Sequence, residues 1–501
     1  MSFANIKWFN ALSIKDIEEV GGKNASLGEM ITGLTTAGVK VPMGFATTAS
    51  AFRDFLKQND LQKKISTIIE KLDINDVKAL KHTGAQIRKW IIETPFLYTF
   101  ERDIKDAYIE LSKDLKDVSV AVRSSATAED LPNASFAGQQ ETFLNVKGIN
   151  NVLLAIKEVF ASLYNDRAIS YRVHHGFEHH KVALSVGIQY MIRSDIASSG
   201  VAFSIDTESG FPDVILINAA FGLGETVVQG TVNPDEYYLY KPNIKSNKFA
   251  ILRKHMGTKA NKMLYKETAN FHEGTTEIIA TTETERQQFA LNEQELHELG
   301  NYVALIENHY KKPMDIEWAK DGINGKIYIL QARPETVKSR ANKQVLTQYS
   351  IKEKGKVLCS GRSIGQMIGQ GKAKILNSIK EMNKLESKDV LVTEMTDPDW
   401  EPIMKRASAI ITNRGGRTCH AAIVARELGI PAIVGCGDAT STITDGQNVT
   451  VSCAEGDTGY VYADLLAFEC KELAIDNMPN LPTKIMLNIA NVEIPSRSLS
   501  I

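Results

Sequence analysis

The chain has 501 residues, of which 43% are hydrophobic, 7% aromatic and 24% charged; this composition is typical of folded globular proteins and excludes collagen, long coiled coils and bulk disorder. At roughly 150 residues per domain, the length predicts about three domains, each large enough to bury its own core. The 58 basic and 60 acidic residues give a net charge of −2, and neither sign forms a long run, so a nucleic-acid partner is not indicated.

The five cysteines stand singly, with no CxxC pair. This spacing argues against a disulfide framework and against a structural zinc site, so we expect reduced thiols. The N-terminus lacks an apolar signal segment, and no stretch approaches the roughly 18 apolar residues of a membrane span. We therefore expect a cytoplasmic chain without a membrane partner.

Residues 1–340 alternate helical and strand-like patterns, which predicts a mixed α and β region. Their first candidate site is Gly21-Gly22-Lys23, a glycine turn that opens a helix predicted over 24–35. Backbone N–H groups at a helix N-terminus, together with a lysine, can bind phosphate oxygens. The pattern is not a P-loop, so a plain turn with a surface lysine is the alternative.

A second candidate lies where a predicted buried strand ends in Arg123, followed by hydroxyl residues and the acids Glu129 and Asp130. The planar guanidinium offers two parallel donors to a phosphate. An arginine in an ordinary surface ion pair is the alternative.

Two strands are predicted on either side of a Gly-containing turn near the end of this region. The period of two places Asp315 and Glu317 on one face of the first strand, and Gln331 and Arg333 on one face of the second. Carboxylate and amide oxygens suit Mg²⁺ that carries nucleotide phosphates. A solvated hairpin face is the alternative.

Two other patterns carry little weight. The segment 221–225 has only two of the three glycines of a dinucleotide fingerprint. The histidine-rich segment 174–180 contains Gly176, which disfavours the helix that would align its rings, so a polar surface turn is expected rather than a metal site.

The polar, lysine-containing segment 341–356 is predicted to be a linker. From 357 to 464, short β-branched strands alternate with helical pieces, which predicts a compact β/α domain. The strands are expected at 390–392, 409–412, 432–434, 449–451 and 460–462, and the helical pieces at 379–386, 400–407 and 419–428. A helical pattern is then expected to about 477, followed by one strand from Leu481 and a polar end.

The strongest candidate is the glycine loop 412–419, which runs from a predicted strand into an Ala-rich helix opened by His420. An anion attached to this ring would be stabilised by the helix N-terminus. The positive potential of the helix N-terminus also disfavours the protonated imidazolium form of His420, so we expect a neutral, nucleophilic ring. Cys419 is interpreted as a loop residue, because the sequence places no general base beside it. For His420, the alternative is a histidine that only caps the helix.

Five ordered motifs resemble those of the phosphoenolpyruvate synthase (pyruvate, water dikinase) family over essentially the whole chain. They are Gly21-Gly22-Lys23, residues 122–132, residues 222–225, residues 315–318 with 331–335, and residues 415–421. The resemblance implies an α/β and α+β multidomain protein, with an ATP-grasp domain of two subdomains over 1–340 and a swivelling phosphohistidine domain over 357–464.

The resemblance also implies the roles of individual residues. His420 is the implied catalytic residue, in a loop supported by Gly415, Gly416, Arg417 and Thr418. The implied ATP-binding residues are Lys23, Arg123, Gln189, Met191, Glu317, Gln331 and Arg333, with Glu317 and Gln331 also holding Mg²⁺.

In the implied reaction, His420 attacks the β-phosphorus of ATP, AMP leaves, water removes the terminal phosphate, and the remaining phosphate passes to pyruvate. Family members continue into a pyruvate-binding (β/α)₈ barrel of about 250 residues, which we expect to be absent, residues 465–501 being a linker and its aborted start. The chain is then expected to phosphorylate His420 only, with pyruvate a partner if a barrel is supplied in trans. The full-length family is implied to form homodimers.

Two alternatives from other functional classes stay open. The chain is either a phosphocarrier or regulatory partner without its own ATP reaction, or an inert fragment.

Overall fold

The structure, a computed structural model, describes residues 5–74, 76–113, 117–127, 130–131, 134–135, 141–174, 182–246, 248–266, 271–335, 345–353 and 355–474. The chain divides into two compact units, called here the first and the second unit. The first contains Met1–Arg193, Leu264–Glu277 and Ile323–Arg333, and the second contains Ser194–Met263, Ile278–Gly322 and Pro334–Ile501. Among the described residues, no helix combines the length and the apolar character that crossing a bilayer requires.

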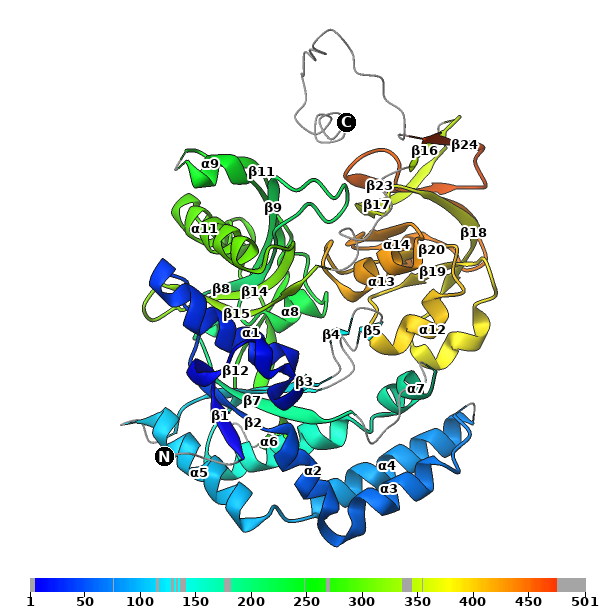
Figure 1. The fold of residues 1–501 in the computed structure, drawn as a ribbon. Helices are drawn as coiled ribbons and strands as arrows, with labels where there is room; N and C mark the ends of the chain where they lie inside the picture. Colours follow the sequence, from blue (N-terminus) through cyan, green and yellow to red (C-terminus); the bar gives the residue numbers. More distant parts are fainter. Residues whose placement is uncertain are drawn as a thin grey trace. The chain divides into compact units, whose positions relative to one another are not determined.

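The first unit is built on an antiparallel sheet with the strand order β1-β2-β7-β3-β6 (Figure 1). These strands are β1 (Ile6–Trp8), β2 (Gly44–Thr47), β3 (Val120–Ala126), β6 (Thr142–Val146) and β7 (Leu184–Tyr190), and the short pair β4 (Asp130–Leu131) and β5 (Ala134–Ser135) lies apart. The helices are α1 (Ile17–Leu34), α2 (Ala49–Lys57), α3 (Leu61–Ile69), α4 (Val77–Glu93), α5 (Tyr98–Ser112), α6 (Ile149–Ser162) and α7 (Asp166–His174). The predicted mixture of α and β structure is confirmed.

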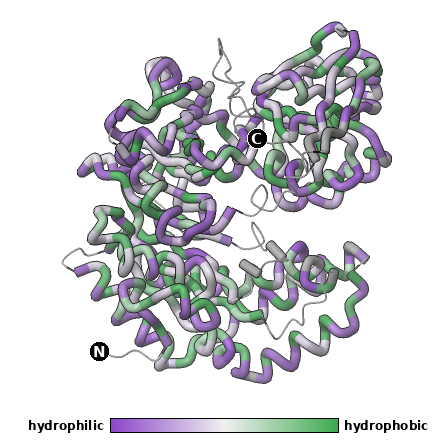
Figure 2. Tube along the Cα trace, turned by 45° about the horizontal axis from the view of Figure 1, so that its top comes forward, coloured by the Kyte–Doolittle hydropathy of each residue, from purple (hydrophilic) through white to green (hydrophobic). Residues whose placement is uncertain are grey.

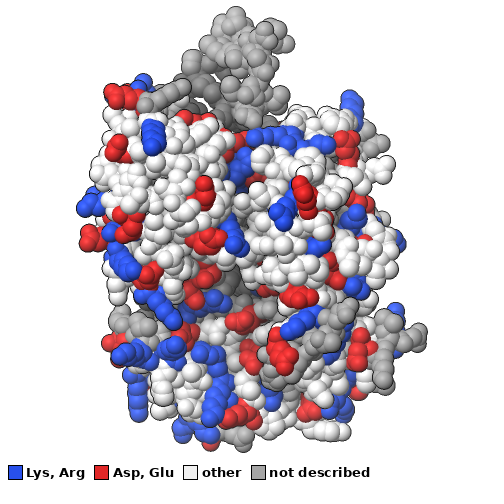
Figure 3. All heavy atoms as spheres, turned by 180° about the vertical axis from the view of Figure 1, so that it is seen from behind, with Lys and Arg blue, Asp and Glu red and all other residues white. Residues whose placement is uncertain are grey.

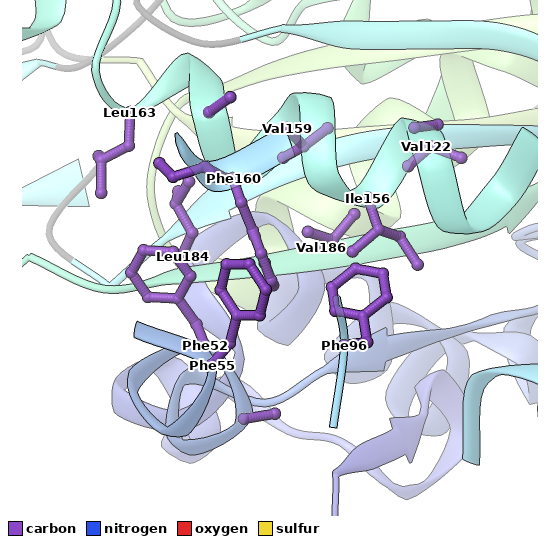
Figure 4. Close-up of a cluster of buried hydrophobic side chains, with 14 of the residues drawn as sticks. Phe52, Phe55, Phe96, Val122, Ile156, Val159, Phe160, Leu163, Leu184 and Val186 are labelled. Atoms are coloured by element: carbon purple, nitrogen blue, oxygen red, sulfur yellow. The ribbon is translucent and has the colours of Figure 1, made fainter. Parts of the chain in front are cut away.

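An aromatic core anchors this sheet (Figure 4). Phe52 of α2 packs edge-on against Phe160 of α6, with ring centroids 4.8 Å apart, and Phe96 approaches the same ring. Val122 of β3 belongs to this core. Because successive strand residues point to opposite faces, burial of Val122 turns Arg123 toward the other face.

The helices of this unit are amphipathic. In α4, the buried residues Leu80, Ile87 and Ile91 recur at helical spacing and form one apolar stripe. Figure 2 shows hydrophilic and hydrophobic residues alternating along such helices. Figure 3 shows basic and acidic side chains interspersed over the visible face, as the near-zero net charge suggests.

The glycine turn at 21–23 differs from its prediction. Helix α1 begins at Ile17, before the turn, and is interrupted at Gly21, whose φ is 74°. A Cβ on Gly21 would lie 2.3 Å from Ser125 Oγ of β3. Close packing of the chain against β3, at a left-handed φ, therefore requires glycine and interrupts the helix.

The second unit contains an antiparallel sheet with the order β11-β10-β9-β8-β14. The strands are β8 (Ser198–Phe203), β9 (Val214–Phe221), β10 (Asp235–Tyr240), β11 (Ile251–His255) and β14 (Met314–Lys320). The next strand along the chain, β15 (Ile327–Pro334), belongs to the first unit up to Arg333. Strands β12 (Asn261–Tyr265) and β13 (Thr276–Ala280) pair with each other. The helices are α8 (Glu225–Val228), α9 (Lys241–Lys245), α10 (Glu283–Arg286) and α11 (Glu293–Tyr310).

The second unit also contains a closed barrel with the order β17-β21-β20-β19-β18-β22-β23. Its strands are β17 (Val357–Ile364), β18 (Ile368–Ile375), β19 (Val390–Thr393), β20 (Ala409–Thr412), β21 (Ala432–Val434), β22 (Asn448–Ser452) and β23 (Thr458–Ala463), and its helices are α12 (Glu401–Met404), α13 (His420–Leu428) and α14 (Ala439–Thr442). All five strands predicted here are confirmed, while the first helical piece is a 3-10 helix at Ile379–Lys384.

Alternation along the barrel strands separates two cores. Val390 and Val392 of β19 lie in the barrel interior, whereas Leu391 lies under the helices with Ile403 of α12 and Val424 of α13. Strands buried on both faces read as continuous apolar runs, which is why they could be recognised from sequence.

Two expectations near the barrel ends need correction. Residues 345–351, predicted to be part of a linker, form β16 (Val345–Ile351), which pairs antiparallel with β24 (Phe468–Ala474). The helix expected to about 477 is therefore wrong. Pairing between segments more than 100 residues apart decides this structure, and a local pattern cannot show it. The limits of the predicted domains stay a prediction.

Some expectations fall outside the described residues. These are Glu129, the histidines at 175, 179 and 180, the first part of the linker at 341–344, and the strand from Leu481 with everything after it.

Candidate functional site

Arg123 is the centre of a polar cluster in the first unit. Its Nη2 donates to Gln331 Oε1 at 2.7 Å, and its Nη1 donates to the Leu330 carbonyl at 3.1 Å and to Gln189 Oε1 at 3.5 Å. One guanidinium thus joins β3, β7 and β15. Three residues predicted from distant motifs lie together here.

The Gln189 side chain in this cluster is 3% exposed. Because arginine is only a donor, Gln189 Oε1 must be the atom that faces Arg123. The Nε2 atom is then buried and has no hydrogen-bond partner among the described residues. Buried N–H donors are normally hydrogen-bonded, so Gln189 Nε2 can donate to an acceptor atom of a bound ligand.

The glycine turn lies beside this cluster. Asn24 N–H donates to Ser125 Oγ of β3 at 3.3 Å, and Ser26 Oγ donates to the Ala332 carbonyl of β15 at 2.7 Å. These bonds fix α1 to the strands that carry Arg123 and Gln331. Lys23 is partly exposed at the turn, so the first unit gathers cationic side chains and backbone N–H groups in one region.

Other predicted residues are placed as follows. Met191 follows β7 and is 9% exposed, and Arg333 is partly exposed near the end of β15. Asp315 and Glu317 are partly exposed between buried neighbours on β14, as the period of two predicts. Glu317 belongs to the second unit, so the first unit alone supplies only Gln331 of the predicted metal pair.

His420 is the first residue of α13, and its ring is partly exposed. Its Nδ1 lies 3.0 Å from the hydroxyl of Thr396, which is 3% exposed. The helix ends at Gly429, with φ 66°, and the Ile430 N–H donates to the Ala425 carbonyl at 3.0 Å. The predicted histidine at a helix N-terminus and the predicted glycine end are confirmed.

Polar groups of the neighbouring sheet hold the loop before His420. Asn218 Nδ2 of β9 donates to Thr418 Oγ1 at 3.0 Å, and Asn233 Oδ1 accepts from the Gly415 N–H at 2.8 Å. Gly415 has φ 112°, a conformation that favours glycine. The loop is therefore held at two points before the helix begins.

The two residues on either side of Thr418 are buried. Arg417 is 2% exposed, and its guanidinium bonds to the Tyr238 hydroxyl and to Asp457. Burial raises the pKa of the Cys419 thiol, which disfavours a thiolate there. Arg417 thus anchors the loop, and Cys419 behaves as the loop residue that the sequence predicts.

Sequence reasoning missed Thr396, Asn218, Asn233 and Tyr238. The last three lie about 180–200 residues from the loop they contact, and none stands in a recognisable motif. Their roles follow only from contacts in the folded chain.

Two family models match the chain. The first, described as the AMP/ATP-binding domain of pyruvate phosphate dikinase, matches residues 17–353, and the second, the mobile domain of PEP-utilising enzymes, matches residues 385–456. The first match covers more than half of the chain. The chain belongs to the pyruvate phosphate dikinase AMP/ATP-binding family. The Arg123 cluster lies inside the first match and His420 inside the second.

The chain is also similar to curated phosphoenolpyruvate synthases. Identity is 59% to that of Escherichia coli and 58% to that of Pseudomonas aeruginosa, covering 97% and 96% of this chain and 61% of each relative. The phosphoenolpyruvate synthase of Neisseria meningitidis is 57% identical over a match that covers 97% of this chain and 62% of that relative. The resemblance read from the five motifs is confirmed, and this pyruvate phosphate dikinase family member spans about three fifths of the length of these relatives.

A solution structure of Enzyme I matches 16% of this family member with a TM-score of 0.15, a value too low to indicate a shared fold.

Proposed function

We propose that this chain transfers phosphate from ATP to His420, the ATP half of the reaction for which its phosphoenolpyruvate synthase relatives are named. The observation that carries the proposal is the contact between His420 Nδ1 and the buried Thr396 hydroxyl. When Nδ1–H donates to this hydroxyl, Nε2 keeps its lone pair and is the nucleophile. The ring at the α13 N-terminus is partly exposed, so an incoming phosphorus can approach it.

The proposed nucleotide site includes the Arg123 cluster. Lys23, Arg123 and Arg333 bind the phosphates, and Gln189 and Met191 contact the adenine between two halves of an ATP-grasp fold. Support comes from the AMP/ATP-binding family match and from the buried Gln189 Nε2 donor. Displacement at phosphorus depends mainly on in-line placement and charge neutralisation, which these cations supply.

Glu317 and Gln331 are proposed to hold Mg²⁺. Carboxylate and amide oxygens are ligand types that Mg²⁺ accepts. Gln331 Oε1 accepts one hydrogen bond from Arg123 and has a second lone pair. Mg²⁺ usually takes few protein ligands beside phosphate oxygens and water. When bound, the ion neutralises phosphate charge. Among the described residues, no group of three or more His, Cys, Asp or Glu side chains forms another metal site.

In the proposed step, His420 Nε2 forms a bond to the β-phosphorus, the bond between that phosphorus and the α–β bridging oxygen breaks, and AMP leaves with the bridging oxygen. Water then hydrolyses the terminal phosphate. The loop contacts of Asn218 and Asn233 must open for the phosphohistidine to reach a second acceptor, and the mobile-domain family match supports such a swivel. That acceptor is proposed to be pyruvate on a barrel.

The remaining proposals follow from the family: a cytoplasmic enzyme of gluconeogenic pyruvate metabolism, and a homodimer when full length. A passive phosphocarrier or an inert fragment is not favoured, because the AMP/ATP-binding match covers most of the first 353 residues.

Labelled ATP tests the proposal. With Mg²⁺ and ATP labelled in the β-phosphate, we expect acid-labile, base-stable label on the peptide that contains His420, together with AMP. With ATP labelled in the γ-phosphate, we expect label that is transient and ends as inorganic phosphate. A reaction without Mg²⁺ is the control, and absence of label from both ATPs would overturn the proposal.

Arg123→Met is predicted to weaken ATP binding by about 10- to 100-fold, because charge-assisted hydrogen bonds contribute about 1.5–3 kcal/mol. Arg123→Lys should lie between this variant and the wild type, since it keeps the charge but loses the planar fork. Calorimetric titration with a non-hydrolysable ATP analogue measures both. Arg53→Met, at an exposed position of α2, is the matched control; wild-type affinity in Arg123→Met would exclude Arg123 from the site.

A further inference from the structure

Two thiols meet in the barrel next to the His420 loop. Cys359 lies on β17 with 7% of its surface exposed, and Cys436 lies two residues after the end of β21, partly exposed. Cys359 belongs to an apolar cluster of the barrel, and Cys436 packs against the same cluster. All five cysteines are free thiols.

The neighbouring glycine shows where the Cys436 sulfur points. Gly361 shares one face of β17 with Cys359, because they are two residues apart. A Cβ on Gly361 would lie 3.0 Å from Cys436 Sγ. The Cys436 sulfur therefore reaches across to the face of β17 that carries the Cys359 side chain.

The strand geometry suits a covalent bond between them. β17 and β21 are antiparallel neighbours, with Arg362 opposite Val434, and neighbouring strands lie about 4.8 Å apart. Cys359 lies three residues before Arg362 and Cys436 two residues after Val434, so the antiparallel direction of the strands brings the two cysteines to about the same level along β17.

We propose that Cys359 and Cys436 are a redox-modification site that forms a reversible disulfide on exposure to hydrogen peroxide. Cys359 sulfur attacks one peroxide oxygen; an S–O bond forms, the O–O bond breaks, and the oxygen that leaves takes the thiol proton to become water. Cys436 sulfur then attacks the sulfenic sulfur; the S–S bond forms, the S–O bond breaks, and hydroxide leaves as water with the Cys436 proton.

The pKa values of the two thiols are shifted in opposite directions. Interaction with the Cys436 thiol lowers the pKa of the Cys359 thiol. The same interaction, together with burial, raises the pKa of the Cys436 thiol. A lower pKa favours the thiolate, so in this proposal Cys359 is assigned as the peroxide-reactive thiol and Cys436 as the resolving thiol.

The backbone around Cys436 contacts the His420 loop directly. The Cys436 N–H donates to the Thr412 carbonyl at 3.0 Å, and the Gly437 N–H donates to the Asn413 carbonyl at 2.9 Å. A Cβ on Gly435 would lie 2.8 Å from the Gly415 carbonyl oxygen. A bond that draws Cys436 toward β17 would shift this contact and displace the loop, so oxidation should slow phosphorylation of His420; this consequence rests on the proposed function.

The test uses the full chain with Cys470→Ser, which removes the exposed thiol. After peroxide treatment and blocking of residual thiols, peptide mass spectrometry should find a Cys359–Cys436 linked peptide that dithiothreitol abolishes. Cys359→Ser and Cys436→Ser should lose it, whereas Cys453→Ser, which removes the buried neighbouring thiol, should keep it. Absence of the linked peptide in the parent, or a different cysteine pair, would overturn the proposal.

The functional consequence has a separate readout. The oxidised chain should incorporate label from ATP about 10- to 100-fold more slowly, as misplacement of a reacting group by about 1 Å does, and dithiothreitol should restore the rate. A linked peptide without a change in rate would refute the regulatory consequence. Absence of label even in the reduced chain would instead count against the proposed function.

Discussion

His420→Asn is expected to abolish covalent incorporation of phosphate from ATP. Asparagine keeps a polar side chain at the α13 N-terminus, and its Oδ1 can accept a hydrogen bond from the Thr396 hydroxyl, but it offers no nucleophilic ring nitrogen. ATP affinity should not change, because the proposed nucleotide-binding residues stay in place. Acid-quenched filter binding measures the label, and calorimetry measures the affinity.

Thr396→Val provides the graded comparison. It removes the hydroxyl beside His420 Nδ1 but keeps the nucleophile, so labelling should slow about two- to tenfold, as loss of one hydrogen bond worth about 0.5–1.5 kcal/mol implies. Label on His420→Asn equal to that of the wild type would place the phosphate on another residue. A Thr396→Val rate equal to the wild-type rate would remove this hydroxyl from the mechanism.

Lys259→Met is expected to be the most destabilising change in the second unit. Lys259 Nζ and Asp235 Oδ1 lie 2.5 Å apart, and both side chains are 0% exposed. Asp235 also accepts from the N–H groups of Gly257 at 2.9 Å and Ala290 at 2.8 Å. Loss of the lysine leaves a buried carboxylate without its counter-charge, a change that costs about 3–5 kcal/mol.

The backbone of Lys259 is also linked to the His420 loop. The Lys259 N–H donates to the Asn233 carbonyl at 3.0 Å, and Asn233 in turn accepts from the Gly415 N–H. Lys259→Met should therefore lower both the melting temperature, by about 10 °C, and the rate of His420 labelling. Scanning calorimetry and labelled ATP measure the two effects.

Lys405→Met is the matched control. Lys405 pairs with Glu401 at 2.7 Å, but its side chain is 54% exposed, and such a surface pair contributes about 0.3–0.5 kcal/mol. The double variant Asp235→Asn with Lys259→Met should recover part of the lost stability, because it removes both buried charges. A Lys259→Met melting temperature as high as that of Lys405→Met would refute the assignment.

Local patterns predicted much of the barrel. The apolar runs of β19 and β20 are long enough, and sharply enough bounded, to be read as strands buried on both faces. His420 and Gly429 mark the two ends of α13, because helix ends have strong local requirements. The interruption of α1 at Gly21 was missed, since it arises from the approach of Ser125, a residue 104 positions later in the sequence.

By itself, the sequence determined which residues carry the chemistry: the ordered motifs around Lys23, Arg123, Gln331 and His420 established the family, since motif order and residue type are properties of the chain alone. Only the tertiary structure decided which groups act together. Arg123 joins Gln189 to Gln331, and Asn218 holds the loop of His420 through Thr418. Partners of this kind are set by packing between distant segments, whose energies depend on the whole fold and leave no periodic mark in the local sequence.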